Sequence, residues 1–270
     1  MVLLLTLSKK RFFMKWSMRF ICLSLLFSVQ LLMAQESTKI SAFKDGETLK
    51  YLVHYGFIDG GYAMLKLTDF EMNGKKYFHA VASGYSTGLA DKLFKVRDVY
   101  ETFVDKETDL PLKAIRNISE DTYKYYDEVL FNRKDNTIIS KRKGKVSVPE
   151  NTMDILSAVY YARNNNFKNI KQGDIITLDT YFDDGMFTLQ IRFKGTETIK
   201  TEFGKVNCLK FSPVVEPGRI FDTQDDVTIW ISNDHNYIPV RIQFDLFVGS
   251  VKADLVKFEN LKYNFAVSKK

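Results

Sequence analysis

The sequence predicts a mostly β protein, built as a curved antiparallel sheet or an open β-barrel-like meander with one central amphipathic helix. Three observations indicate this class. Apolar and polar residues alternate through most of the chain after Thr48. The connections between the alternating runs are short and rich in Gly, Asn and Asp, so sequence neighbours pair as antiparallel strands. One segment near the middle has helical spacing instead.

The alternation is clearest in two C-terminal stretches. Every second residue is apolar in 187–193 and again in 240–246, as in strands that bury one face. The turn residues Asp59-Gly60-Gly61 favour a tight first hairpin. The other predicted strands are 49–57, 62–70, 76–83, 96–104, 112–118, 123–131, 137–143, 175–182, 206–211, 227–231 and 251–258.

Residues 149–166, PENTMDILSAVYYARNNN, break the pattern of alternation. Four apolar residues between positions 155 and 162 fall at helical spacing. Asn151 or Thr152 can cap the first turn, in which Asp154 adds a favourable negative charge. The segment predicts an amphipathic helix near 153–164, between an N-terminal and a C-terminal set of strands.

The first 34 residues have the order of a secretory signal peptide. Five basic residues precede an uncharged run of about 14 residues at 20–33, and the small residue Ala34 follows. That run is shorter than the roughly 20 residues that span a bilayer as a helix. Translation starting at Met1, Met14 or Met18 leaves a complete signal in each case.

The predicted organisation is therefore a signal peptide at 1–34, an N-terminal extension at 35–45 and a single β-rich domain at 46–265. We expect no transmembrane span once the signal is removed. The expected location is outside the cytoplasm, most simply the periplasm, with outer-membrane association or secretion as alternatives.

The charge of the chain belongs mostly to its targeting segment. The full sequence has a net charge of +6, with 39 Lys and Arg against 33 Asp and Glu. The first 34 residues hold five of the basic residues and no acidic ones, so their removal leaves about +1. Such a composition does not support a nucleic-acid groove. Cys208 is then the one remaining cysteine, which excludes an internal disulfide.

Conventional catalytic motifs are missing from the sequence. His54, His79 and His235 have no metal-ligand spacing, and Cys208 reads as a core thiol. We expect no cofactor, no metal and no enzymatic activity. Carboxylates leave one alternative, a hydrolase of envelope polysaccharide, because two acidic residues suffice for glycoside hydrolysis. Its candidates are Asp183, Asp184, Asp222, Asp225 and Asp226, although turns and solvated loops explain each of them.

Aromatic residues make up 14% of the chain, and tyrosines cluster in YKYYDEVLF and AVYYAR. An amphipathic helix beside a curved sheet, lined by such side chains, can form an apolar cleft. The alternative is a thick aromatic core.

Several stretches together closely resemble an exported bacterial family catalogued as domain of unknown function 3108. They are GETLKYLVHYGFIDGGYAMLKL, KVRDVYETFVDKETDLPLKAIRNISE, NTMDILSAVYYAR and TIWISNDHNYIPVRIQFDLFVGSVKADL, within residues 46–261. The ordered landmarks are Tyr51, Tyr55, Gly60, Gly61, Ala63, Asp98, Tyr100, Pro111, Asp154, Leu156, Tyr160, Arg163, Trp230, Asp234, Pro239 and Gly249. The resemblance implies export, a β-rich domain with a helix, and no known activity or cofactor. The outline is similar to envelope lipoprotein carriers, an analogy of fold alone.

The leading functional hypothesis is a non-enzymatic binding or carrier module for an apolar or amphipathic envelope molecule, such as a lipid or glycan. The alternative is a structural or assembly partner that binds an envelope protein, and the oligomeric state stays open. Candidate residues for ligand binding or helix docking are Arg97, Asp98, Asp154, Tyr160 and Arg163. We expect the charged ones to fix the helix on the sheet by an ion pair, or alternatively to orient a polar headgroup.

Overall fold

The structure is a computed structural model that describes residues 41–164, 170–214 and 226–268. The predicted signal peptide and residues 35–40 of the predicted extension lie outside the described residues. Ser41–Lys270 form one compact unit. Within the described ranges, no helix has both the length and the apolar character needed to cross a membrane.

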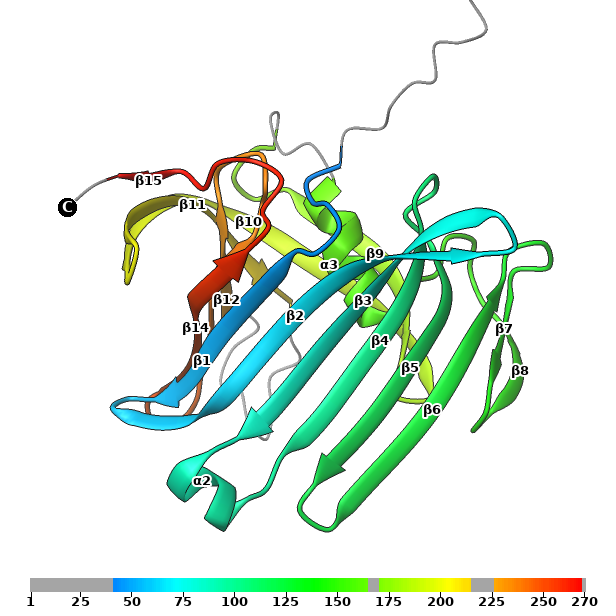
Figure 1. Cartoon of the computed structure of the whole chain (residues 1–270), viewed down its shortest axis with the longest axis horizontal. Coiled ribbons are helices and arrows are strands. Elements are labelled where there is room, and N and C mark those ends of the chain that lie inside the picture. The colour runs from blue at the N-terminus through cyan, green and yellow to red at the C-terminus, as the bar shows by residue number, and fades with distance from the viewer. Residues whose placement is uncertain (1–40, 165–169, 215–225, 269–270) are drawn as a thin grey trace, which may run out of the picture. The chain divides into compact units, whose positions relative to one another are not determined.

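The predicted mostly β class is confirmed, because the strands form one antiparallel meander that does not close into a barrel (Figure 1). Their order is β8-β7-β6-β5-β4-β3-β2-β1-β14-β13-β12-β11-β10-β9, and β15 pairs with β11. The first eight are β1 Thr48–Tyr55, β2 Ile58–Met72, β3 Lys75–Ser86, β4 Arg97–Asp105, β5 Pro111–Glu120, β6 Tyr123–Asn132, β7 Thr137–Ser140 and β8 Gly144–Ser147. The others are β9 Ile175–Phe182, β10 Gly185–Thr201, β11 Gly204–Pro213, β12 Val227–Ser232, β13 Pro239–Asp245, β14 Ser250–Glu259 and β15 Val267–Ser268.

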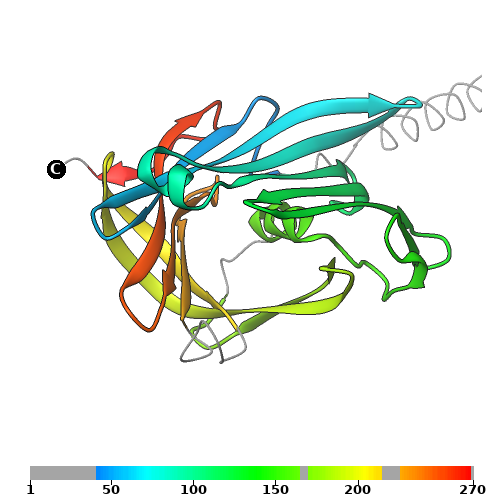
Figure 2. The ribbon, with the colours of Figure 1, turned by 90° about the horizontal axis from the view of Figure 1, so that it is seen from below.

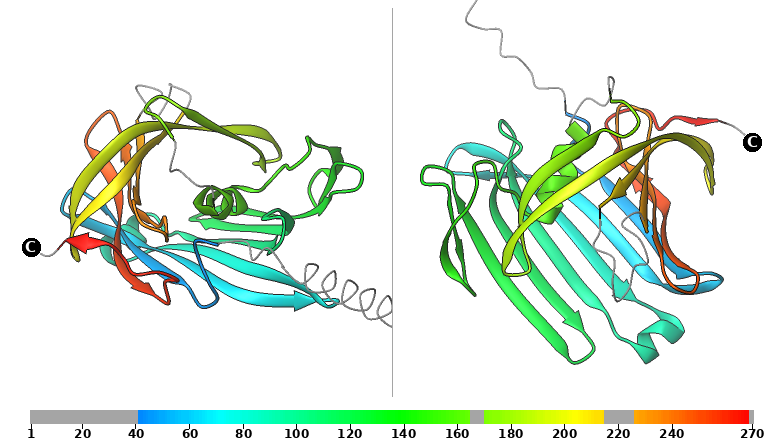
Figure 3. Two further views of the ribbon diagram at one scale, coloured as in Figure 1. Left: turned by 90° about the horizontal axis from the view of Figure 1, so that it is seen from above. Right: turned by 180° about the vertical axis from the view of Figure 1, so that it is seen from behind.

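The meander curls so that its two halves face one another across the helix α3, Ile155–Asn164 (Figures 2 and 3). The halves are joined by the pairing of β1 with β14, which extends from Thr48↔Glu259 to Tyr55↔Val251. Helix α3 lies on the concave side and contacts β3, β4 and β9. Met153, just before the helix, forms a parallel bridge to Thr180 of β9, which ties the helix to the second half of the sheet.

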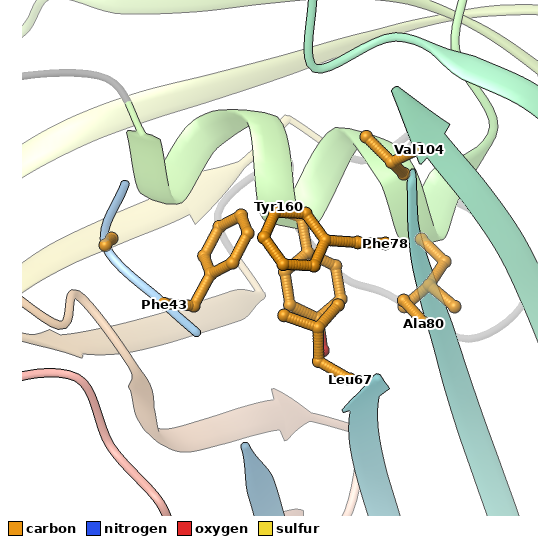
Figure 4. Packing of buried hydrophobic residues seen from close by; sticks show 8 residues of the cluster. Phe43, Leu67, Phe78, Ala80, Val104 and Tyr160 are labelled. Carbon is orange, nitrogen blue, oxygen red and sulfur yellow. The ribbon is translucent and has the colours of Figure 1, made fainter. Parts of the chain in front are cut away.

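Tyr160 anchors α3 in the core between the helix and strands β2 to β4 (Figure 4). Its ring packs edge-on against Phe43 with centroids 5.0 Å apart, and Phe43 meets Phe78 in the same way at 5.2 Å. Leu67 and Val104 complete the contact from the sheet. The alternation of strands and the helical spacing of α3 thus deliver apolar side chains to one shared core.

The start of α3 differs from the expected cap. The helix begins at Ile155, and its N-terminal cap is Asp154 rather than Asn151 or Thr152. The Asp154 carboxylate accepts the backbone N–H groups of Leu156 and Ser157 at 2.9 and 3.1 Å, and the Ser157 hydroxyl lies 3.1 Å from the Asp154 N–H. This reciprocal arrangement satisfies N–H groups that have no partner inside the helix.

A second helix, α2 Gly88–Leu93, was not expected, since the prediction contained a single helix. It has six residues and none of them is buried, so it carries no periodic apolar face that a sequence pattern could reveal. Likewise, the predicted strand 137–143 is shorter than expected, because β7 ends at Ser140 and a turn at 141–143 leads into β8, which was not predicted.

The first hairpin also differs from the prediction. Its turn is made by Gly56 and Phe57, with Gly56 at a φ of 55°, whereas Gly60 and Gly61 lie inside β2. The register shifts beside them, as His54 faces Asp59 and Val53 faces Gly61. A Cβ atom at Gly61 would lie 2.1 Å from the Tyr85 carbonyl oxygen. Glycine is therefore required here by a close approach of two strands rather than by a turn.

Candidate functional site

Arg163 holds the end of α3 in the core through a partner that the sequence did not suggest. Its guanidinium pairs with the Glu47 carboxylate through two bonds of 2.6 and 2.9 Å, and both side chains are at most 2% exposed. The Asn236 carbonyl oxygen accepts a further bond from Arg163 at 3.0 Å. This fully bonded pair docks the helix and does not face a cleft.

The other candidates on α3 also have structural contacts. Asp154, besides capping the helix, accepts a hydrogen bond of 2.7 Å from the Thr102 hydroxyl of β4. Burial raises the pKa of the Asp154 carboxyl above its usual value, although the bonds from Ser157 and Thr102 oppose this effect. Tyr160 is 2% exposed within the core.

Arg97 and Asp98 are adjacent in sequence but lie in different surroundings. Arg97 is bonded to Asp91 of α2 at 2.7 Å and to the Ser86 carbonyl oxygen at 3.2 Å, which fixes the short helix to the sheet. Asp98 accepts the Ser119 N–H at 3.0 Å. The structure therefore does not bring the five candidates together. Asp98 belongs to the charged surface described next, and Asp154 lines the cavity beside that surface.

Strands β4, β5 and β6 carry polar and aromatic residues on the same face as Thr102, the face that contacts α3. Tyr100, Arg116 and Asp127 stand opposite one another across the three strands. Two residues further along are Asp98 and Tyr125, and Glu120 lies near the end of β5. We call this set the concave wall, defined by Asp98, Tyr100, Arg116, Glu120, Tyr125 and Asp127. A folded sheet ordinarily places apolar residues at such inward positions.

Arg116 lies at the centre of the concave wall. Its guanidinium carbon lies 4.5 Å from the Tyr125 ring centroid and 4.4 Å from that of Phe182, so aromatic rings surround the charge. It donates a bond of 2.8 Å to Asp183 in the turn between β9 and β10. Burial alone would lower the pKa of Arg116, but Asp183 and the neighbouring Tyr100 hydroxyl outweigh it and raise the pKa above its usual value.

The Nε atom of Arg116 is buried and has no hydrogen-bond partner among the described residues. A buried N–H without a partner costs free energy, commonly about 1–3 kcal/mol. Such a group is most simply retained where something else, a water molecule or a ligand, can accept its bond.

Tyr125 is held on its other side by Asp184. The Tyr125 hydroxyl donates to Asp184 at 2.9 Å, and Arg142 bonds the same carboxylate at 3.2 Å while lying 4.5 Å from the Tyr125 ring centroid. Burial and the Asp184 carboxylate raise the pKa of Tyr125, so the phenol stays protonated and acts as a donor. Asp183 and Asp184 are thus engaged in ion pairs at the edge of the wall.

A carboxyl pair, Asp98 and Glu120, lies at the end of the wall. Burial and the adjacent Asp98 carboxylate raise the pKa of Glu120, while Arg116 acts in the opposite direction. A neighbouring carboxylate makes the charged form of Glu120 less favourable, so Glu120 holds its proton more tightly. The wall therefore combines hydrogen-bond donors and acceptors with flat aromatic surfaces.

The space enclosed between the wall, the start of α3 and the β9–β10 hairpin is small. A cavity of about 40 Å³ is lined by Tyr100, Arg116, Tyr125, Asp127, Asp154, Tyr181 and neighbouring residues. That volume holds roughly two or three water molecules, whereas ligand pockets commonly reach about 300–1,000 Å³. Only a small group can enter it fully.

The described residues contain no group of three or more His, Cys, Asp or Glu that could hold a metal ion. His54 instead lies 3.0 Å from Asp254, and His79 lies 2.8 Å from Glu101. Asp222 and Asp225 lie outside the described residues. Cys208 is buried, as predicted, and burial raises the pKa of its thiol to about 12.

Sequence reasoning missed Arg116 and Glu120, and it indicated Tyr125 only as one of the clustered tyrosines of YKYYDEVLF. A signal was present, since Arg116 falls at an alternate position between Ala114 and Ile118, both buried. A charged residue at an apolar position of a strand is informative because burying a charge is costly unless it is paired.

Together, the open sheet, the docked helix and the concave wall define a mostly β, barrel-like protein with a polar inner surface. The chain belongs to the family described as protein of unknown function DUF3108, whose model matches residues 50–256. This confirms the family resemblance seen in the sequence. No curated protein matches the chain.

Two solved structures are similar in fold. A beta-barrel-like protein of domain of unknown function DUF1849 from Brucella abortus has a TM-score of 0.55 at 9% identity, over 82% of this chain and 100% of that one. The hypothetical protein CT021 from Chlamydia trachomatis has a TM-score of 0.35 at 8% identity, over 84% of this chain and 93% of that one. The first likeness supports the barrel-like fold, and the second carries no argument.

Proposed function

We propose that this protein is an exported, non-enzymatic binding module of the bacterial cell envelope, which takes the polar end of an amphipathic molecule at the concave wall. The observation that carries the proposal is Arg116, a charged residue with an unpartnered buried N–H, placed among aromatic rings on the inner face of a sheet. Guanidinium groups recognise anionic and hydroxyl-bearing groups, and aromatic rings receive apolar or ring-shaped surfaces.

The small volume of the cavity limits which part of such a molecule can enter it. A polar group enters beside Arg116, and the larger part of the ligand lies across the mouth between β6 and the β9–β10 hairpin. A carrier that encloses an acyl chain needs a larger cavity than this one, which has a volume of about 40 Å³. At this site the proposal is therefore binding against the concave wall rather than enclosure in the cavity.

Binding is favoured over carboxylate-dependent hydrolysis by the state of the acidic residues. Asp183 and Asp184 are bonded to Arg116, Arg142 and Tyr125. Asp98 accepts the Ser119 N–H, and its carboxylate helps to raise the pKa of Glu120. These engaged carboxylates favour a binding role for the wall.

The test is to purify the protein from its native periplasm, extract it with organic solvent and identify bound molecules by mass spectrometry. We expect a recurrent amphipathic molecule with wild-type protein and its loss with Arg116→Leu. Lys113→Leu is the matched control, since Lys113 lies on the same strand and pairs with Glu128, outside the wall. Extracts of wild-type protein that are repeatedly empty would contradict the proposal, as would unchanged recovery from Arg116→Leu.

A further inference from the structure

Large apolar side chains are exposed at one end of the sheet, on three connections. We call them the apolar rim, defined by Phe57, Ile58, Leu89, Leu93, Phe94, Phe247 and Val248, which are between 51% and 105% exposed. They belong to the β1–β2 turn with the first residue of β2, to α2 with the residue after it, and to the β13–β14 turn. The concave wall and its cavity do not include any of them.

The three connections are neighbours in space. Thr87, just before α2, donates a bond of 3.0 Å to the Gly60 carbonyl oxygen, near the start of β2. The Tyr55 hydroxyl, at the end of β1, donates a bond of 2.7 Å to the Val248 carbonyl oxygen. Strands β14, β1, β2 and β3 are adjacent in the sheet, so the apolar rim is continuous along one end of these strands. Figure 1 shows α2 and the β1–β2 turn at this same end.

Folding does not explain these side chains. Turns need glycine and small polar residues, and nothing in the hairpin geometry requires Phe57 next to Gly56. Leaving large apolar side chains in water forgoes the favourable free energy that burying them would give. A continuous group of them marks a surface that is covered by something else.

The charges beside the rim differ between its connections, since Asp59 and Asp245 lie beside the two hairpin turns and two lysines lie on and just after α2. Lys92 and Lys95 flank Leu93 and Phe94, both lysines are exposed, and neither has an acidic side chain within 4.0 Å in the part of the chain that the structure describes. The nearby Asp91 is already bonded to Arg97 at 2.7 Å. Apolar side chains at protruding tips, with lysines beside them, match the boundary between acyl chains and anionic headgroups.

We infer that the apolar rim docks this protein on a lipid bilayer that carries anionic headgroups. The side chains of the rim enter the headgroup region, and the ammonium groups of Lys92 and Lys95 lie at the level of the lipid phosphates. The sheet then stands with its β1–β2 end toward the membrane. This inference rests on the exposed rim alone and holds whether or not the concave wall binds a ligand.

The test is flotation of the chain starting at residue 35 with vesicles, at low and high salt. One set contains phosphatidylethanolamine and phosphatidylglycerol, and the other contains phosphatidylcholine alone. We expect binding to the anionic vesicles that weakens with salt. The triple variant Phe57→Ser, Leu93→Ser, Phe247→Ser should bind at least about tenfold more weakly. That loss corresponds to about 1.4 kcal/mol or more of binding free energy. Lys92→Gln with Lys95→Gln should remove most of the preference for anionic lipid.

The matched control is Leu130→Ser with Ile139→Ser, two exposed side chains that face each other on β6 and β7, away from the rim. It should bind as the wild type does. All variants replace exposed residues, and melting curves check that they fold. Wild-type protein that stays unbound with both kinds of vesicle would overturn the inference. Equal binding by the triple variant would do so too, as would a rim-dependent dimer or protein adduct in place of vesicle binding.

Discussion

At the scale of single residues, the buried pair of Arg163 and Glu47 carries the largest consequence for stability. Both groups have left water. Arg163 compensates the Glu47 carboxylate, while Glu47 and the Asn236 carbonyl oxygen compensate the Arg163 guanidinium. Removing one partner leaves an uncompensated charge in the core. Removing both leaves an apolar space that the surrounding aromatic rings can partly fill.

We therefore expect Arg163→Met to lower the free energy of unfolding by about 3–5 kcal/mol. The double variant Glu47→Leu, Arg163→Met should recover a large part of that loss, because no buried charge remains. Lys257→Met, which breaks the exposed pair with Glu259, is the control and should change the free energy of unfolding far less, because solvent screens that pair. Urea unfolding measures all three, and an unchanged midpoint for Arg163→Met would show that the pair does not hold α3.

Gly61 gives a second prediction at this scale. Alanine at this position would place a Cβ atom 2.1 Å from the Tyr85 carbonyl oxygen, so the strands must separate. We expect Gly61→Ala to destabilise the fold by about 1–3 kcal/mol. Gly84→Ala, on the neighbouring strand, meets no atom within 4 Å and should be nearly neutral. Thermal melting compares the two, and equal melting temperatures would contradict the close-approach explanation.

At the scale of elements, α3 depends on a buried acid for its cap. Burial raises the pKa of Asp154, so the folded protein holds this proton more tightly than the unfolded chain does. The tighter binding of this proton stabilises the folded protein fully at a pH below the pKa of Asp154 in the unfolded chain, which is about 3.9. The stabilisation is lost as the pH rises through the higher pKa of Asp154 in the folded protein. Asparagine at this position keeps a capping oxygen but has no proton to lose.

The stability of the wild type relative to Asp154→Asn should therefore increase as the pH falls from about 7 to about 4. Asp154→Ala removes the cap altogether and should cost about 0.5–2 kcal/mol over the whole range. Urea unfolding at several pH values gives both comparisons. A difference between wild type and Asp154→Asn that does not vary with pH would show that Asp154 has no raised pKa in the folded protein.

The elements that the sequence predicted are those with a long apolar period. The strands and α3 repeat their apolar residues often enough to be recognised. Helix α2 was missed because its six residues bury no face, and the β1–β2 turn was misplaced because glycine serves both turns and close approaches. Predicting the concave wall would have required the register between the strands. The register places Tyr100, Arg116 and Asp127 side by side, whereas alternation shows only which face of its strand each residue occupies.

At the scale of the whole molecule, the two halves of the meander are joined by β1 and β14 and by α3 between them. Leu49 and Tyr51 of β1 share one core cluster with Leu255 of β14 and Ile238. Cys208 lies on β11 in the second half, at 0% exposure, and Phe265 and Val267 pack against its cluster. A disturbance in the first half should therefore reach Cys208 only if the halves unfold together.

Thiol labelling tests this cooperativity on the chain starting at residue 35, in which Cys208 is the one cysteine. The buried thiol, with its pKa raised to about 12, reacts only when the structure opens, so the labelling rate reports the population of open molecules. We expect Gly61→Ala, which lies on β2 in the first half, to speed labelling by the factor that its measured loss of unfolding free energy implies, about tenfold for each 1.4 kcal/mol. Gly84→Ala should leave the rate nearly unchanged. A large loss of stability from Gly61→Ala without faster labelling would mean that the second half stays folded alone, and that the pairing of β1 with β14 does not couple the two halves.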